Sequence, residues 1–272
     1  MKRQFVDPDY SRLFSLPLLS VIFVSTKMQG EELTRFVIGV IGNVISGLLF
    51  LSPMPTFWRI HKKRSTEAFH PYPYLASVMN CILWIFYGLP MVHPNSVLVV
   101  TINSAGLFLQ LCYLTIFFCY TNKKNRGIIV LLLLAEAALF AGIVVVTLVC
   151  FHTHVKRSMF VGIVCIVFGI IMYGSPLSIV AKVVRTKSAE FLPFWLCLAG
   201  FANGLVWFAY ANLYTFDLYI AIGNGVGGLL GLLQLLVYGF YTFRTWRIGP
   251  VHNHVKPGDV QLQNVAANRP SV

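Results

Sequence analysis

Charged residues are scarce in this sequence. Of its 272 residues 11% are charged and 57% are hydrophobic, whereas soluble domains are about 25% charged. An ordinary soluble domain is therefore excluded, because its core could not enclose so many apolar side chains. Acidic residues are the fewest, with 9 Asp and Glu against 21 Lys and Arg and a net charge of +12. The apolar residues lie in long runs, which is typical of a polytopic membrane protein.

The motifs of common catalytic and cofactor sites are also absent. The sequence has no P-loop, no H-E-x-x-H and no G-x-S-x-G, so neither catalysis nor a cofactor is expected. Its 6 cysteines lie in apolar runs without metal or redox spacing. Two H-x-H pairs, His152 with His154 and His252 with His254, lack a third ligand, so we expect no metal site.

Seven apolar runs approach the roughly 20 residues that a helix needs to cross a bilayer. Backbone groups in lipid must be satisfied within the protein, and no short alternating strands occur. We therefore expect an all-α membrane protein with seven transmembrane helices. The predicted spans are Phe36–Phe57, Pro71–Met91, Val97–Tyr120, Gly127–Phe151, Met159–Val184, Leu192–Leu213 and Leu218–Phe243.

Lys and Arg concentrate in the loops on one side of these spans, including Arg59 to Arg64 and Lys123 to Arg126. Cytoplasmic loops carry an excess of such residues, so the N-terminus is predicted outside and the C-terminus in the cytosol. The excess of Lys and Arg is thus explained by the orientation of the helices in the membrane, and no nucleic-acid partner is expected. Residues 1–34 are predicted to form an extracellular extension, and residues 244–272 a disordered cytosolic tail.

The two halves of the sequence resemble each other at a nearly fixed offset. The matched pairs are Pro53 with Pro176, Asn80 with Asn203, Trp84 with Trp207 and Tyr87 with Tyr210 at an offset of 123 residues, and Asn103 with Asn224 at 121. Because four crossings separate equivalent helices, the copies run in the same direction. We expect two parallel three-helix repeats, 35–121 and 158–243, joined by a connector helix at 122–157 (3+1+3).

Uncharged polar residues mark the predicted interface of the two repeats. Asn80, Asn103, Asn203 and Asn224 each offer two donors and two acceptors, which suits hydroxyl-rich ligands such as sugars. Trp84 and Trp207 lie one turn after Asn80 and Asn203 and could cover the apolar face of a ring. A single buried Asn more often only bonds two helices together. Four in repeat-related positions favour a polar substrate site.

Other features have two interpretations. Gly223, Gly225 and Gly228 match a dinucleotide fingerprint, but no strand precedes them, which favours helix packing. Glu136 in the connector could be a proton site or a packing residue. Pro53 and Pro176 lie late in spans one and five, and Pro71 and Pro193 begin spans two and six. This symmetric quartet predicts hinges, although the second pair could simply start helices.

Several motifs are similar to those of the plant SWEET sugar transporters. They include Leu51-Ser52-Pro53-Met54-Pro55-Thr56-Phe57, Tyr87-Gly88-Leu89-Pro90, Thr101-Ile102-Asn103 and Ser175-Pro176-Leu177-Ser178. The resemblance implies passive alternating access and two parallel repeats, which are properties of this family. It implies sugar binding by Asn103 and Asn224, with Asn80, Asn203, Trp84 and Trp207 around them. It also implies the four prolines as hinges and Tyr87 with Asp217 as the outer gate.

The same resemblance implies the substrate class and the location. Leu49 and Met172 match positions linked to substrate size, and two bulky side chains there favour a monosaccharide such as glucose over sucrose. The branch of closest resemblance implies the plasma membrane, with the vacuolar membrane as the alternative. Partners expected are the monosaccharide and the lipid bilayer, and oligomers with itself or with family members stay open. A proton-coupled symporter and, less favoured, a seven-helix receptor are the alternative functions.

Overall fold

The computed structural model describes residues 30–248, all of whose regular elements are helical. The predictions made for residues 1–29 and 249–272, including the pair His252 and His254, lie outside the described residues. The helices are α2 (Gly30–Leu51), α3 (Met54–Lys63), α4 (Tyr72–Gly88), α5 (Val97–Tyr120), α6 (Lys123–Cys150), α7 (His154–Met172), α8 (Gly174–Thr186), the short 3-10 helix η2 (Ala189–Phe191), α9 (Phe194–Asn212) and α10 (Leu218–Ile248).

Two predicted spans are each divided into two helices. The first run breaks between Leu51 and Met54, where Pro53 cannot donate a backbone hydrogen bond. The fifth run breaks at Tyr173, three residues before Pro176. Both prolines lie at helix breaks, yet each pair of helices still forms one candidate membrane span, Gly30–Lys63 and His154–Thr186. Helices α3 and α8 continue beyond the predicted ends, to Lys63 and Thr186.

The outer boundaries of the helical region also differ from the sequence prediction. Helix α2 begins at Gly30, so residues 30–34 belong to the first helix and not to the predicted extension. Glu31 and Glu32 in its first turn favour this start, because carboxylates interact well with the positive end of a helix. Helix α10 continues to Ile248, so residues 244–248 are helical and not part of a disordered tail.

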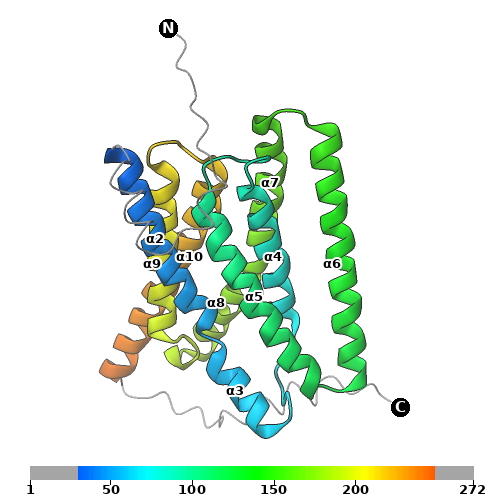
Figure 1. Cartoon of the computed structure of the whole chain (residues 1–272). Coiled ribbons are helices and arrows are strands. Elements are labelled where there is room, and N and C mark those ends of the chain that lie inside the picture. The colour runs from blue at the N-terminus through cyan, green and yellow to red at the C-terminus, as the bar shows by residue number, and fades with distance from the viewer. Residues whose placement is uncertain (1–29, 249–272) are drawn as a thin grey trace, which may run out of the picture.

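The two repeats interlock through their first helices. Within each repeat the first helix packs on the third (α2 on α5, α7 on α10) and the second on the third (α4 on α5, α9 on α10). Between repeats, α2 packs on α9 and α7 packs on α4. The connector α6 lies on the outside of the first repeat, against α4, α5 and α7 (Figure 1). The expected 3+1+3 arrangement is confirmed, and it places a central axis between α2, α4, α7 and α9.

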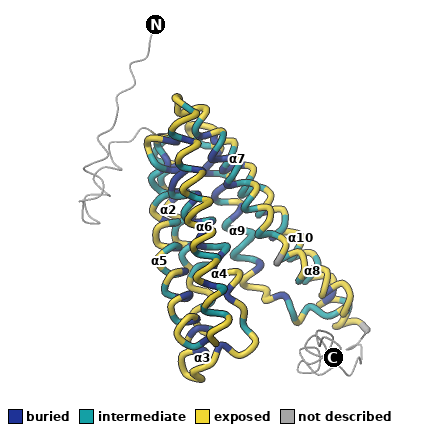
Figure 2. Tube along the Cα trace, turned by 90° about the vertical axis from the view of Figure 1, so that its right-hand side faces the viewer, coloured by how far each residue is buried: buried dark blue, intermediate teal, exposed yellow. Residues whose placement is uncertain are grey.

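The length and surface of the helices fit a bilayer. Six helical stretches are long and apolar enough to cross a membrane, and α4, with 17 residues, lies at the lower end of the usual range. Large apolar side chains are exposed along them, for example Leu131 and Leu134 of α6. Figure 2 shows that the helices lie together at the upper end and diverge below, where α3 and α8 lie on opposite arms. The repeats are therefore joined most tightly at one end.

Candidate functional site

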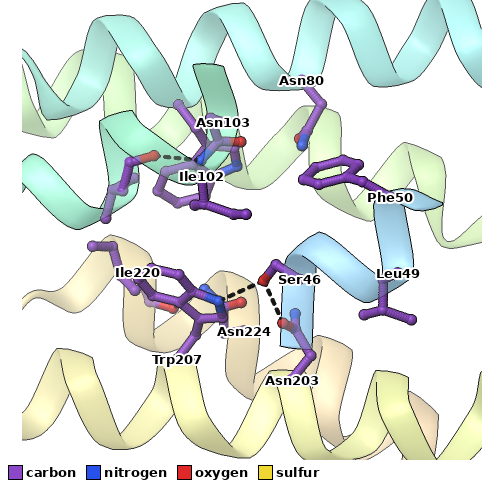
Figure 3. Close-up of a pocket in the computed structure, with 12 residues that line it drawn as sticks. Ser46, Leu49, Phe50, Asn80, Ile102, Asn103, Asn203, Trp207, Ile220 and Asn224 are labelled. Carbon is purple, nitrogen blue, oxygen red and sulfur yellow. Dashed lines mark hydrogen bonds between the residues drawn. The ribbon is translucent and has the colours of Figure 1, made fainter. Parts of the chain in front are cut away.

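A cavity of about 230 Å³ lies between the two repeats, near the middle of the helices. Asn80 and Asn103 line it from the first repeat, and Asn203 and Asn224 face them from the second (Figure 3). All four asparagines singled out from the sequence are half-buried at this one place. Its other lining residues are Ser46, Leu49, Phe50, Trp84, Val99, Ile102, Trp207 and Ile220. The cavity combines neutral hydrogen-bonding groups with aromatic and aliphatic walls.

Asn103 and Asn224 are held in the same way by their own helices. Asn103 Nδ2 donates to the Val99 carbonyl at 2.8 Å, and Asn224 Nδ2 donates to the Ile220 carbonyl at 3.0 Å. Each bond spans one helical turn and fixes the amide plane. An Asn side chain has two N–H donors and a carbonyl acceptor, so each retains one N–H and the Oδ1 atom toward the cavity. The pair can thus both donate to and accept from a bound hydroxyl group.

Ser46 of the first repeat, a residue that the sequence pattern did not identify, binds two side chains of the second repeat that line the cavity. Trp207 Nε1 donates to Ser46 Oγ at 2.9 Å, and Ser46 Oγ donates to Asn203 Oδ1 at 2.5 Å (Figure 3). Trp207 is buried, at 5% exposure, and packs closely on Gly42 of α2. The position equivalent to Ser46 in the second repeat is Gly169, which has no hydroxyl. The search for repeated residues therefore could not identify Ser46.

A second cavity of about 180 Å³ adjoins the first, because Asn80, Trp84 and Asn224 line both. It extends the space toward α7, where it is lined by Met172 and Tyr173. The Tyr173 hydroxyl donates to the Gly223 carbonyl at 2.8 Å. Leu49 lines the first cavity and Met172 the second, so these repeat-related side chains border the space from opposite repeats.

The cavity is closed at one end by a buried contact between the repeats. The Tyr87 hydroxyl contacts both carboxylate oxygens of Asp217, at 2.9 and 3.0 Å, and the two side chains are 0% and 2% exposed. Asp217 precedes α10, and its Oδ1 also accepts the backbone N–H groups of Tyr219 and Ile220 at 3.0 Å each. An Asp at this position stabilises a helix start, which fixes the carboxylate in place.

Two basic side chains complete this closed end. The His93 ring stacks on Tyr87 with centroids 4.9 Å apart, and its Nε2 lies 3.5 Å from Asp217 Oδ2. Arg35 lies over the ring of Tyr210, 4.2 Å from its centroid. Burial lowers the pKa of His93 below its ordinary value of 6.5, and Arg35 and His154 act in the same direction, while Asp217 opposes them. The closed contact therefore favours a neutral His93.

The comparisons with known proteins agree on one family. The family model described as "Sugar efflux transporter for intercellular exchange" matches residues 36–125 and again 159–245. The chain is 50% identical over 237 residues to the bidirectional sugar transporter SWEET7 of Arabidopsis thaliana, covering 87% of this chain and 91% of that protein. The chain belongs to the SWEET family. The double match of the family model coincides with the two three-helix repeats.

Other SWEET proteins are similar over comparable lengths. The putative bidirectional sugar transporter SWEET7d of Oryza sativa subsp. japonica is 51% identical over 214 residues, which are 79% of this chain and 77% of that protein. A solved structure of a eukaryotic SWEET transporter is 37% identical, with a TM-score of 0.74, and the alignment covers 78% of this chain and 99% of that one. This chain is therefore an integral membrane protein with the SWEET fold.

The four prolines of this SWEET protein lie at helix boundaries. Pro53 is the N-cap of α3 and Pro176 lies in the first turn of α8, so both follow the breaks in the first helix of each repeat. Pro71 and Pro193 are the N-caps of α4 and α9, which matches the simple alternative of helix-start residues. All four lie at the end opposite the contact between Tyr87 and Asp217.

The glycine-rich stretch of α10 serves close packing. A Cβ atom added to Gly204 of α9 would lie 2.5 Å from the backbone nitrogen of Gly228. Gly231 packs on the backbone of Phe201, while Gly227 faces the Tyr173 hydroxyl. These glycines let α10 approach both α9 and α7, as expected for small residues in membrane helices. The dinucleotide interpretation has no strand to support it in the part of the chain that the structure describes.

Glu136 lies apart from the central site. It belongs to the connector α6, is half-buried, and lines neither of the two adjoining cavities. Its Oε2 atom is buried and, among the residues that the structure describes, accepts no hydrogen bond. Its position does not bring it together with the four asparagines.

Proposed function

We propose that this protein is a bidirectional facilitative transporter of monosaccharides such as glucose, and not an enzyme. The observation that carries the proposal is the central cavity, where uncharged amides from both repeats face each other between two tryptophan side chains. Amides match sugar hydroxyl groups because both kinds of group donate and accept hydrogen bonds. The relatives named as bidirectional sugar transporters agree with this class of substrate.

The dimensions of the site favour a monosaccharide over a disaccharide. The space between the repeats is divided into two small adjoining chambers of about 230 Å³ and 180 Å³, which share Asn80, Trp84 and Asn224. Leu49 and Met172 narrow the space from opposite repeats. We propose that Asn103 and Asn224 bind the sugar, that Trp84 and Trp207 cover its ring, and that Asn80 and Asn203 supply further polar contacts.

The mechanism proposed is alternating access. The contact between Tyr87 and Asp217 closes one end, while α3 and α8 diverge at the other end (Figure 2). Rocking of the repeats about Pro53, Pro71, Pro176 and Pro193 would open the closed end and close the open one. We place the closed end outside the cell, because the basic loops lie at the opposite end. The proposed location is the plasma membrane.

Transport of labelled sugar into liposomes tests the proposal. Wild-type protein should carry glucose faster than sucrose and should equilibrate it without accumulation, whether or not a pH gradient is present. Accumulation that depends on the gradient would instead indicate proton coupling, with Glu136 as the candidate group. Equal rates for both sugars would contradict the monosaccharide preference.

Single substitutions test the site residues. Asn103→Ala and Asn224→Ala should each abolish glucose uptake, because each removes hydrogen-bonding groups that line the cavity. Asn212→Ala is the matched control, since Asn212 also donates to a carbonyl one turn earlier, at 2.7 Å, but is exposed. Uptake should be normal in the control. Full uptake in either cavity variant would refute the assigned role.

A further inference from the structure

An open apolar groove lies between α9 and α10, away from the central cavity. Its volume is about 560 Å³, and its surface is almost wholly apolar. It lies where α9 begins and α10 ends, at the lower left of Figure 1. Aromatic residues on its edge are strongly exposed, with Phe243 at 53% and Trp246 at 80%. The groove is lined by Phe194, Leu198, Leu235, Tyr238, Gly239, Thr242, Phe243 and Trp246.

The same surface is covered in the first repeat. The repeat offset pairs Leu198 with Leu75, Leu235 with Leu114, and Tyr238 with Phe117. The three residues of the first repeat are 2%, 3% and 0% exposed, whereas their partners in the groove are half-buried. Ile129 of the connector α6 belongs to the same buried cluster, and Leu132 and Leu133 pack against it. In the first repeat α6 therefore helps to bury this surface, together with Phe57 and Ile60 of α3, and the corresponding surface of the second repeat has no connector helix on it within residues 30–248.

This difference follows from the 3+1+3 architecture. Residues 30–248 hold one connector helix, α6, and it packs on α4, α5 and α7. The second repeat reproduces the apolar surface of the first, and α8 packs on part of it, but no second connector helix covers the rest among the described residues. Within a bilayer, the molecules next to such a surface are lipid acyl chains, which fill a groove of this kind by close packing.

The charges beside the groove select the lipid class. Arg247 lies over the ring of Phe243, 4.7 Å from its centroid, and so holds a guanidinium group at the edge of the groove. Arg244 lies one turn before Arg247 on the same helix. Both stand at the basic end of the molecule, where a cytosolic leaflet supplies anionic headgroups. Arginine pairs with phosphate through two parallel hydrogen bonds.

We propose that the α9–α10 groove is a binding site for one anionic phospholipid, whose acyl chain fills the groove and whose headgroup pairs with Arg244 and Arg247. The lipid takes the place that α6 takes in the first repeat. It seals the second repeat beside Pro193, at the end of the molecule where the repeats diverge.

Charge repulsion argues against helix α6 of a second molecule as the occupant of the α9–α10 groove. If α6 of another molecule lay in the groove as α6 lies on the first repeat, its first turn would face the end of α10. That turn carries Lys123, Lys124 and Arg126. These three positive charges would then lie near Arg244 and Arg247, five in all, and their repulsion is unfavourable.

The test measures retained lipid on the full chain. The protein is reconstituted in phosphatidylcholine vesicles that contain a minor share of phosphatidylserine and is then extracted in mild detergent. Native mass spectrometry identifies the lipids that stay bound by the mass they add. Wild-type protein should retain phosphatidylserine in preference to phosphatidylcholine. Replacing Arg244 and Arg247 by Gln should weaken this retention about fivefold for each arginine, because a basic residue near an anionic surface contributes about 1 kcal/mol.

A second variant fills the groove without disturbing the helices. A Cβ atom added at Gly239 meets nothing within 4 Å, so Gly239→Leu should fold and displace the acyl chain. Gly127→Leu is the matched control, because Gly127 is also open and lies at the same end of the molecule, on α6. It should retain the lipid. Equal retention of both lipids by wild type, equal retention by both leucine variants, or a dimer that Gly239→Leu dissociates would overturn the proposal.

Discussion

Removal of the Tyr87 hydroxyl group should open the closed end of the protein. In the closed state Tyr87→Phe leaves the Asp217 carboxylate without this donor, although the backbone N–H groups of Tyr219 and Ile220 remain. In a state open to the outside, water would replace the lost bond, so the substitution penalises the closed state alone. The substitution should therefore shift the equilibrium toward the state in which this end is open.

The magnitude follows from the character of the bond. A hydrogen bond to a charged group contributes about 1.5 to 3 kcal/mol, and both partners here are buried. A penalty of about 2 kcal/mol lowers the ratio of closed to open molecules roughly 30-fold. A population that is almost entirely closed in wild type would thus contain a measurable outward-open fraction in the variant.

Spin labels on the two loops at this end can measure that fraction. Pro94 and Thr215 are exposed and lie on the loops before α5 and α10, so cysteines placed there would report the distance across the gate. The exposed native cysteines, Cys119 and Cys150, would first be replaced by serine. A longer distance should appear in the Tyr87→Phe protein.

The control for this measurement lies on the same helix. Tyr72 is exposed at the opposite end of α4, so Tyr72→Phe should leave the distance distribution unchanged. An unchanged distribution in Tyr87→Phe would mean that the contact with Asp217 does not hold the outer end closed. The gate function proposed for this pair would then be wrong.

Two further predictions concern helix packing and pH. Gly204→Ala should destabilise the protein by about 1 to 3 kcal/mol in a thermal unfolding assay, because its Cβ would meet the backbone of Gly228 at 2.5 Å. Gly200→Ala is the control, since its Cβ would meet open space, and it should be neutral or stabilising in the same assay. Burial lowers the pKa of His93 below 6.5 in the closed contact, so the closed state disfavours protonated His93. Above pH 6.5 His93 is neutral and the closed state has its full stability. This stability is lost as the pH falls from 6.5 toward the lowered pKa. The outward-open fraction should therefore rise below pH 6.5 in wild type, and a rise of equal size in His93→Gln would exclude this residue as the cause.

The sequence by itself determined the class of the protein, its repeats and most of the residues at the centre. Long apolar runs allow one stable backbone structure in lipid, the helix, so their number and approximate place follow from composition. The offset that pairs Asn103 with Asn224 and Trp84 with Trp207 depends on residue identity alone. Because equivalent residues of two parallel repeats face a common axis, their convergence on one cavity could be predicted.

Only the tertiary structure decided the features that break this symmetry. Ser46 holds Trp207 while its equivalent, Gly169, holds nothing through a side chain, and no repeat search can detect a residue without a counterpart. His93 contacts Tyr87 because a loop brings the His93 ring onto that side chain. The α9–α10 groove is open because one connector helix cannot cover two repeats at once. Contacts between distant segments depend on how the helices pack in three dimensions, which local patterns in the chain do not specify.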